Sequence, residues 1–436
     1  MRRGLACAAL VLALAANASA QDTHYWSQKY GSRSLLLGGV VIGSVVDLSG
    51  TYYNPGGVAL LDAPLILTAK AFEHSTLRLE NGAGPGIDLE TSQSGLVPTF
   101  VSGTFPRFLP EGHTLYYSFF PRFVFGAEVD ARQQTAASGT EAFDEFVSRI
   151  DLDESWAGLT WSYRVTERLG IGVSQYLAVR SQFASTRVTS QTMDPAGEAT
   201  VGLDLRGFDY TDYRLLWKAG VAWHVVGFSF GANITSPSLH IAGSGKGGID
   251  ILNVDTTGSP GTNEYAVTLQ EASSDYRSPV SAGFGASYSI AAATVHASVE
   301  WFEAIGPYDV LKTSSFVAQG SGATIPAPVL QNLESVVNWG VALEYQISPR
   351  TVGFAAFATD YSANFKGSNS NTSFSSWDTY LVTVGSSFTV GKSEFTLGAG
   401  YGFGDTDRLP LADIGGQVQD AKLIYRNLRL IFGFSI

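Results

Sequence analysis

The chain is poor in cysteine and in charged residues. Its only cysteine is Cys7, within the first twenty residues, so disulfides, cysteine-ligated metals and a cysteine nucleophile are excluded from the rest of the chain. Charged residues make up 15% of the sequence, against roughly 25% in ordinary soluble domains. After the first twenty residues no apolar run approaches the roughly 20 residues that a membrane-spanning helix requires.

The first twenty residues predict a secretory signal. Arg2 and Arg3 precede a short apolar stretch from Leu5 to Ala16, and Ala18-Ser19-Ala20 is typical of a cleavage site. We therefore expect residues 1–20 to be removed near Ala20. The 27 basic residues minus these two leave 25 against 39 acidic ones, a net charge of −14. Such a chain is not expected to bind nucleic acid.

What the sequence does contain is glycine, aromatic residues and alternation. There are 48 glycines, and aromatic residues make up 12% of the chain. From Phe395 the sequence F-T-L-G-A-G-Y-G-F-G places apolar and small residues at alternate positions, and Val295 to Trp301 and Trp339 to Ile347 alternate in the same way. This period of two predicts strands with one apolar face. A soluble sandwich and an outer-membrane barrel both fit the pattern.

The connections between these stretches favour the barrel. Six tight turns are predicted, at Pro106–Gly112, Thr166–Arg168, Val225–Gly227, Ala291–Ala293, Ser348–Arg350 and Gly391–Ser393. Longer, more polar connections are predicted between them, at Gln133–Glu145, Ala242–Asn263 and Gly306–Val329. Short turns that alternate with long loops are typical of barrels with periplasmic turns and outer loops.

The turn count predicts the size of the barrel. Six turns join twelve strands, and one further strand at each end of residues 64–436 gives fourteen. We therefore predict an all-β fold, a 14-stranded antiparallel transmembrane β-barrel, with both ends on the periplasmic side. The stretch Asn263–Glu271 alternates weakly and is either a strand or part of a loop. The last strand ends on Phe432, Phe434 and Ile436, an apolar terminus that the barrel-assembly machinery would recognise, and we expect a monomer.

Residues 21–63 do not alternate, and we expect them to fill the barrel as a plug. A barrel of this width is too wide for its wall side chains alone to fill. Asn54-Pro55 predicts a helix start, with Asn54 as N-cap and Pro55 at the first helical position. Gly56 and Gly57 would allow the turn to lie close to the wall. The alternative is a plain capped turn without a role in gating.

The stretch SGTYYNPGGVALLDAP resembles the N-terminal hatch of the FadL-type outer-membrane transporters of long-chain fatty acids and aromatic hydrocarbons. The usual family form is Asn-Pro-Ala-Gly-Leu-Ala, which Asn54, Pro55, Gly57 and Ala59 match, while Gly56 and Val58 replace Ala and Leu. The resemblance implies fourteen strands around a plug whose movement opens a path, and a kinked third strand that opens the wall sideways.

Pro121 is the candidate for that kink, within YYSFFPRFVFG. Proline has no N–H group and therefore interrupts a strand ladder. We predict a kink or bulge at about Phe119–Arg122, which includes Phe120, next to the part of the plug that contains Asn54–Gly57. Pro98 in the preceding strand is an alternative for the same role, and a bulge without function is the alternative interpretation.

Other side chains suggest capture and anchoring. In the long connections, apolar residues offer a surface for ligand capture: Val310, Leu311, Phe316, Ile325 and Leu330. Trp156, Trp161, Trp217, Trp223, Trp301 and Trp339 are expected to anchor the barrel at the membrane interfaces.

No enzyme motif is evident in the sequence. His296, Ser298 and Glu300 share a face of one strand, but successive positions on a face are about 7 Å apart, too far for a Ser–His hydrogen bond. The other histidines lack metal-ligand spacing, and no P-loop or dinucleotide fingerprint occurs. We therefore expect neither an enzyme nor a bound cofactor or metal.

The sequence thus predicts a passive channel for hydrophobic molecules in the outer membrane of a Gram-negative bacterium, surrounded by lipid and lipopolysaccharide. A general porin for small hydrophilic solutes is the main alternative, although its N-terminus would normally enter a strand directly. A surface adhesin or receptor barrel that uses only its loops is a further alternative. The ligand stays open among fatty acids, alkanes and monoaromatics.

Overall fold

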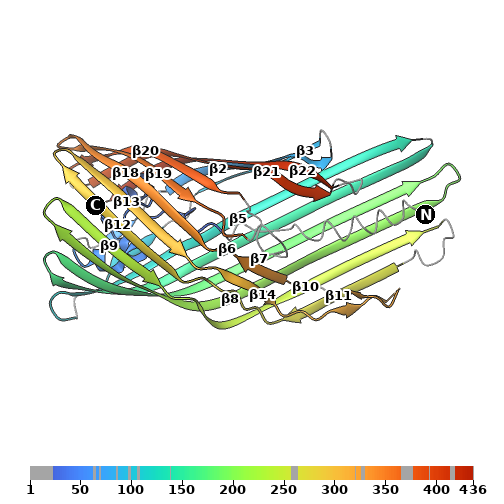
Figure 1. The fold of residues 1–436 in the computed structure, drawn as a ribbon, viewed down its shortest axis with the longest axis horizontal. Helices are drawn as coiled ribbons and strands as arrows, with labels where there is room; N and C mark the ends of the chain where they lie inside the picture. The colour runs from blue at the N-terminus through green and yellow to red at the C-terminus, as the bar shows by residue number, and fades with distance from the viewer. Residues whose placement is uncertain are drawn as a thin grey trace.

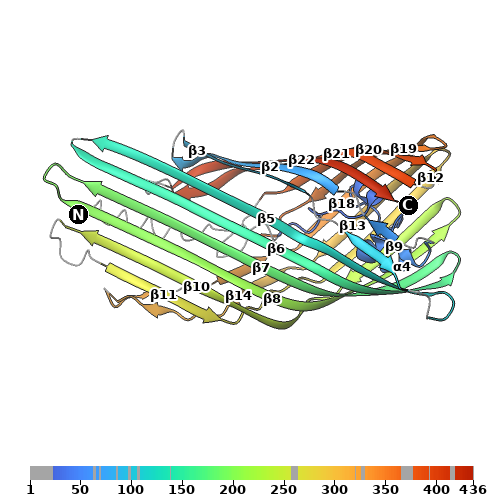
Figure 2. The ribbon, with the colours of Figure 1, turned by 180° about the vertical axis from the view of Figure 1, so that it is seen from behind.

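The fold is almost entirely antiparallel β-sheet (Figures 1 and 2). The computed structural model describes residues 23–61, 65–67, 70–84, 87–96, 100–105, 109–137, 139–256, 264–319, 321–325, 329–364, 377–391, 393–412 and 418–435. Within these ranges, three short helices precede the strands: α2 (Ser32–Leu36), α3 (Gly50–Tyr53) and α4 (Pro55–Val58). Across these ranges, none of the helices is long and apolar enough to cross a membrane.

The strands follow in chain order. They are β1 (Leu65–Leu67), β2 (Lys70–Gly84), β3 (Ile87–Leu96), β4 (Val101–Thr104), β5 (His113–Ala137), β6 (Thr140–Thr166), β7 (Leu169–Met193), β8 (Ala199–Val225), β9 (Phe228–Thr235), β10 (Leu239–Asp255), β11 (Glu264–Ala272), β12 (Ser281–Ile290), β13 (Ala293–Phe302), β14 (Ile305–Leu311), β15 (Phe316–Val317), β16 (Thr324–Ile325), β17 (Val329–Leu333), β18 (Val336–Ser348), β19 (Thr351–Asp360), β20 (Thr379–Val390), β21 (Ser393–Ala412) and β22 (Val418–Ser435).

Most of these strands pair with their neighbours in one large sheet. Each strand from β5 to β8 pairs antiparallel with the next one in the chain, and so does each of the strands β18 to β22. Both β9 and β10 pair with β8. The last strand, β22, pairs with β2, which also pairs with β3. On the other side, β4 pairs with β1 and β5. In the part of the chain that the structure describes, no ladder joins β3 to β5, so the pairing is interrupted there.

The tight turns lie where the sequence predicts them. Consecutive strands are joined by turns at the predicted positions 166–168, 225–227, 291–293, 348–350 and 391–393. The turn predicted at Pro106–Gly112 lies between β4 and β5, and residues 106–108 of it fall outside the described ranges.

Two of the predicted long connections are wrong. Gln133–Glu145 lies within β5 and β6, which stay paired up to Ala137 and Thr140, and residues 242–255 belong to β10. The weakly alternating stretch near Asn263–Glu271 is strand β11 from Glu264 onward. A transmembrane strand needs only about 9–11 residues, whereas β6 has 27, or roughly 90 Å at about 3.3 Å per residue. Its far end therefore extends well beyond the length that a membrane crossing requires, and the alternation of buried and exposed residues is lost there.

The faces of the strands decide between the two architectures. On β13, Val295, Val299 and Trp301 are exposed, while the polar residues between them are buried. A soluble sandwich would bury the apolar face. An exposed apolar face with a buried polar one is instead the arrangement of a strand between lipid and a polar interior.

The tryptophans divide between the two faces. Trp223, Trp301 and Trp339 are exposed, as expected of side chains at a membrane interface. Trp156 was predicted to join them, but it is only 7% exposed, and its indole N–H donates to Glu154 at 2.6 Å. The reason is its position on β6, where even-numbered residues from Ile150 to Ser162 face the buried side.

Residues 23–61, the N-terminal segment, lie among the strands near the end of β22 (Figures 1 and 2). Most of the side chains in the segment are buried. The predicted helix start is confirmed, because the Asn54 side chain accepts a hydrogen bond from the Gly56 N–H at 3.1 Å and Pro55 begins α4.

Candidate functional site

Asn54 fixes the N-terminal segment to the sheet. Its amide nitrogen donates to the Ile42 carbonyl at 2.8 Å, within the segment, and to the Val221 carbonyl of β8 at 2.9 Å. A Cβ atom on Gly56 would lie 2.6 Å from the Gly220 carbonyl oxygen, so only glycine allows this backbone approach. Gly57 does not contact the sheet in this way, because a Cβ atom on it would meet the side chain of Val45, which belongs to the N-terminal segment itself.

Three successive buried positions of β13 also hold the segment. Ser44 Oγ lies 2.6 Å from His296 Nδ1, the Ile42 N–H donates to Ser298 Oγ at 3.3 Å, and the Trp26 indole donates to Glu300 at 2.8 Å. Sequence reasoning explained these β13 residues only as a polar face. Their partners come from a segment more than 250 residues away, so no local pattern could have revealed the contacts.

The segment carries a buried cation at Lys29. Its ammonium group lies 4.8 Å from the Trp26 ring centroid. Burial lowers the pKa of Lys29 to about 7, an effect that the nearby Asp360 carboxylate partly opposes. At neutral pH this side chain is therefore close to the point at which it loses its charge.

The irregularity predicted near Pro121 is present in β5. The register against β6 shifts between Pro121 and Phe123, so that one extra residue is inserted. As a result Arg122 and Phe123, which are adjacent in sequence, are both buried, as is Phe120. Pro98, the alternative, lies outside the described residues.

The bulge contacts the N-terminal segment, but not at the residues expected. The Tyr30 hydroxyl donates to the Pro121 carbonyl at 2.8 Å, and the Arg122 guanidinium donates to the Tyr25 carbonyl at 2.7 Å. Tyr52 packs edge-on against Phe120, with 5.3 Å between ring centroids. Asn54–Gly57 lie instead against β7 and β8. This turn comes so close to Gly170, Gly172 and Gly220 of those strands that a side chain at any of the three positions would clash with it.

A cavity of about 260 Å³ lies where β3 and β5 are not paired. Phe123, Val124 and Phe125 of β5 form an apolar part of its lining, and Gln93, Ser94 and Gly95 of β3 also line it. The remaining lining comes from β2, β22 and the N-terminal segment, with Glu73, Ser75, Tyr425, Arg429, Ser27 and Gln28.

The gap has a boundary at each end. On one side β4 pairs with β5 as far as Phe119. On the other side, side chains of β2, β3, β5 and β22 form an apolar cluster that includes Leu79, Leu89, Val129 and Leu423. The opening in the ladder is therefore local, and both of its ends are held by packing or hydrogen bonds.

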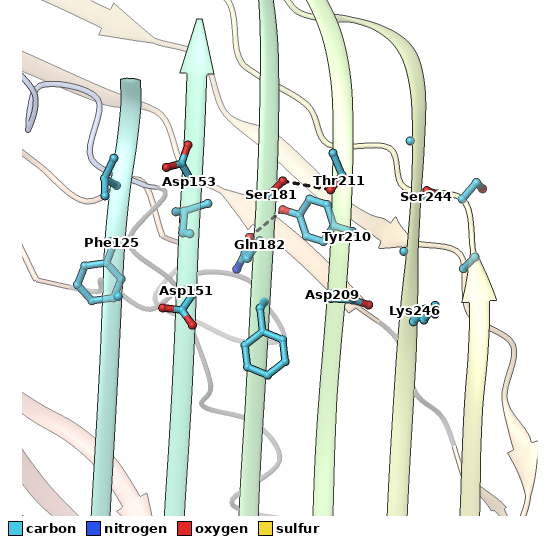
Figure 3. A pocket seen from close by; sticks show the side chains of 18 of the residues that line it. Phe125, Asp151, Asp153, Ser181, Gln182, Asp209, Tyr210, Thr211, Ser244 and Lys246 are labelled. Atoms are coloured by element: carbon cyan, nitrogen blue, oxygen red, sulfur yellow. Dashed lines mark hydrogen bonds between the residues drawn. The ribbon is translucent and has the colours of Figure 1, made fainter. Parts of the chain in front are cut away.

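A second, larger cavity of about 1080 Å³ crosses β5, β6, β7, β8, β10 and β11 (Figure 3). Gln93, Val124 and Phe125 line both cavities, so the two adjoin at the gap. In its lining Tyr210 donates to Gln182 at 2.8 Å, and the Ser181 and Thr211 hydroxyls are 3.1 Å apart (Figure 3).

A buried ionic cluster, which the sequence analysis missed, lies close to these residues. Glu154 of β6 is paired with Arg180 of β7 at 3.1 Å and with Arg214 of β8 at 2.6 Å. Both guanidinium groups lie over the ring of Tyr276, at 4.0 and 4.6 Å. The available signal was a charged residue at an inward position on each of three adjacent strands. Buried charges of this kind persist only when they are paired.

The residues proposed for capture do not form one exposed surface. Val310 and Leu311 on β14 are fully buried, and β14 pairs with β17, which carries Leu330. Phe316 and Ile325 pair across β15 and β16 and pack on a separate cluster that contains Ile249. Val310 and Leu311 therefore do not lie on an exposed surface, because the loop folds back as strands whose apolar side chains are packed.

The closing strand is paired on both sides. β22 forms ladders with β21 and β2, and Phe432 is exposed on it. The Phe434 side chain and Ile436, the other residues expected to meet the assembly machinery, lie outside the described residues.

Comparison with known proteins finds solved structures with a similar fold. No family model matches the sequence, and no curated protein does. A solved FadL homologue from Pseudomonas aeruginosa matches with a TM-score of 0.63 at 12% identity, covering 94% of this chain and 99% of that one. The toluene transporter TodX of Pseudomonas putida matches at 0.63 and 11%, covering 93% and 98%. The toluene transporter TbuX of Ralstonia pickettii matches at 0.55 and 12%, also covering 93% and 98%. The chain therefore has the fold of the FadL homologue and of these two toluene transporters.

Proposed function

We propose that the chain is an outer-membrane channel, not an enzyme, for passive uptake of hydrophobic small molecules such as long-chain fatty acids or aromatic and aliphatic hydrocarbons. In this proposal fourteen strands close into a barrel, residues 21–63 act as its plug, and the ligand leaves sideways between β3 and β5. The observation that carries the proposal is the cavity beside the β5 bulge, at the interruption of the ladder.

The physical argument concerns where an apolar solute can go. Charged, hydrated lipopolysaccharide excludes it outside, and the periplasm is aqueous. Lateral release into lipid avoids the second barrier. An opening in the wall exposes backbone groups, each of which costs several kcal/mol if it faces hydrocarbon unpaired. Ser27 and Gln28 of the N-terminal segment line the gap and place protein, rather than lipid, against it.

The neighbouring structures support the class of ligand. TodX and TbuX are described as toluene transporters, and another structure with this fold, CymD, is described as a monoaromatic hydrocarbon channel. We place the first binding step in the larger cavity, because it adjoins the gap at Gln93, Val124 and Phe125. Ligand affinity there would come from burial of apolar surface, at roughly 25 cal/mol per Å².

A reversible cross-link across the gap tests the proposal. After signal removal the chain is expected to contain no cysteine, so the double variant Gln93→Cys/Gly126→Cys would carry the only thiols. These positions face each other, since a Cβ atom on Gly126 would lie 2.7 Å from Gln93 Nε2. We expect oxidation to block uptake of labelled toluene and oleate by cells, and a reductant to restore it.

Each single-cysteine variant serves as a control and should take up ligand under both conditions. Full uptake by the oxidised double variant, with the disulfide verified by mass spectrometry, would contradict lateral exit. Rapid passage of small hydrophilic sugars into proteoliposomes would instead favour a general porin.

A further inference from the structure

An aromatic side chain of the larger cavity lies between strands that carry acidic side chains. Phe183 of β7 has Asp151 of β6 and Asp209 of β8 as its register partners. Asp153 of β6 is the register partner of Ser181, which lies two positions before Phe183 on the same face of β7. All five residues line the cavity. Because neighbouring strands are about 4.8 Å apart, a molecule that covers Phe183 comes close to these carboxylates.

A ligand can reach these side chains. The three aspartates and Phe183 are exposed, whereas the residues that alternate with them along the strands are buried: Leu152, Gln182 and Tyr210. The acidic groups and the Phe183 ring therefore stand on the accessible face of the sheet, where Asp151, Asp153 and Asp209 can be followed in Figure 3.

The lining carries more negative charge than positive charge. Four carboxylates and one ammonium group line the cavity: Asp151, Asp153, Asp209, Glu271 and Lys246. Lys246 lies 3.9 Å from Glu271. Arg149, whose guanidinium lies 5.9 Å from the Phe183 ring centroid, is paired with Asp151 at 2.9 Å. Asp153 and Asp209 remain, and neither has an ion pair among the described residues. The two unpaired carboxylates lie on the strands on either side of Phe183.

We propose that the larger cavity selects its apolar ligands by charge. It binds an aromatic ring against Phe183, accepts a neutral or cationic substituent, and disfavours a carboxylate. Asp153 and Asp209 are its specificity-determining residues, because they repel an anion and the cations nearby are already paired. The inference rests on the proposed function and narrows its ligand class, since it favours hydrocarbons and neutral aromatic molecules over fatty-acid anions.

Three matched ligands test this proposal on the full-length mature protein in a non-ionic detergent at neutral pH. Benzylamine, benzyl alcohol and benzoate carry an ammonium, a hydroxyl and a carboxylate group on the same ring. We expect calorimetry to show benzoate binding about fivefold more weakly than benzyl alcohol, the factor for two like charges roughly 4 Å apart in water. Benzylamine should bind more tightly than benzyl alcohol. At about 1 M salt the Debye length falls to about 3 Å, so the three affinities should converge.

The double variant Asp153→Asn/Asp209→Asn should strengthen benzoate binding, remove the advantage of benzylamine and leave benzyl alcohol unchanged. The matched control is Asp130→Asn/Glu198→Gln, which removes the same net charge from exposed residues that line neither cavity. It should keep the order of affinities. Heat-modifiable gel migration verifies that each variant is folded, and the salt series tests the same point without any substitution.

The inference and the proposed function fail in different ways. Equal affinities for the three ligands in the wild type, an order that salt does not change, or an unchanged order in the Asp153/Asp209 variant would overturn the inference. Absence of binding by all three would also overturn it, if labelled toluene still enters cells. If none of the three binds and toluene does not enter cells, the proposed function itself fails.

Discussion

Removal of one buried carboxylate should destabilise the protein far more than removal of an exposed one on the same strand. Glu154 and Glu145 both lie on β6, and each is paired with two arginines. The side chains of Glu154, Arg180 and Arg214 are at most 1% exposed. Glu145 pairs with Arg132 and Arg187, whose side chains are 65% and 46% exposed. The pair of sites differs mainly in burial.

The expected magnitudes follow from that difference. Glu154→Gln removes the carboxylate that pairs with both buried guanidinium groups, while Asp212 stays 3.7 Å from Arg214. Loss of one partner of a buried ion pair typically costs about 3–5 kcal/mol, or roughly a hundredfold or more in the unfolding equilibrium. Glu145→Gln should cost under about 1 kcal/mol, because water solvates the arginines that it leaves behind.

The assay is equilibrium unfolding in urea, followed by tryptophan fluorescence in a detergent or lipid system that allows reversible refolding. Linear extrapolation gives the free energy of unfolding for each variant. A cost below about 1 kcal/mol for Glu154→Gln would refute the reasoning, as would equal costs for the two variants. The first result would mean that water reaches the cluster and screens it.

Three further predictions concern the bulge and the N-terminal segment. Pro121→Val restores a backbone donor to β5, so the strand should straighten, narrow the gap and slow uptake of labelled toluene severalfold while heat-modifiable migration is unchanged; normal uptake would contradict a role for the bulge. Deletion of residues 21–63 should raise single-channel conductance in planar bilayers, and unchanged conductance would argue against a plug. The pKa of Lys29 is about 7 in the folded protein, against an ordinary value of 10.5 that we expect in the unfolded state. Between these two pH values the unfolded state binds more protons than the folded state. The free energy of unfolding should therefore rise with pH from about 7 to 10.5. That rise should be smaller in Lys29→Met when urea midpoints are compared across the same pH range, and an identical slope would mean that Lys29 is solvated.

Local sequence determines the strands and the turns of this protein. The period of two is a property of the extended backbone itself, in which neighbouring side chains point to opposite faces. The alternation in β13 and β18 therefore marks strands without any knowledge of their partners. The same holds for Asn54-Pro55, because an N-cap and a first-turn proline act within three residues. Pro121 likewise marks the irregularity in β5, since its missing N–H is a local property.

Tertiary structure alone decides which side chains meet. Alternation shows that a strand has two faces but not which of them is buried. The sequence therefore allows Trp156 on either face, and only the register of β6 places it inside. The partners of Glu154 and His296 come from distant parts of the chain, and their pairing depends on strand order and stagger. The polar ends of β5 and β6 resemble loops in sequence, because their residues do not alternate between apolar and polar, yet their ladder hydrogen bonds continue to Ala137 and Thr140. The interruption between β3 and β5, with Gln28 at its edge, arises only when the sheet and the N-terminal segment pack together, since each contributes one part of the cavity wall.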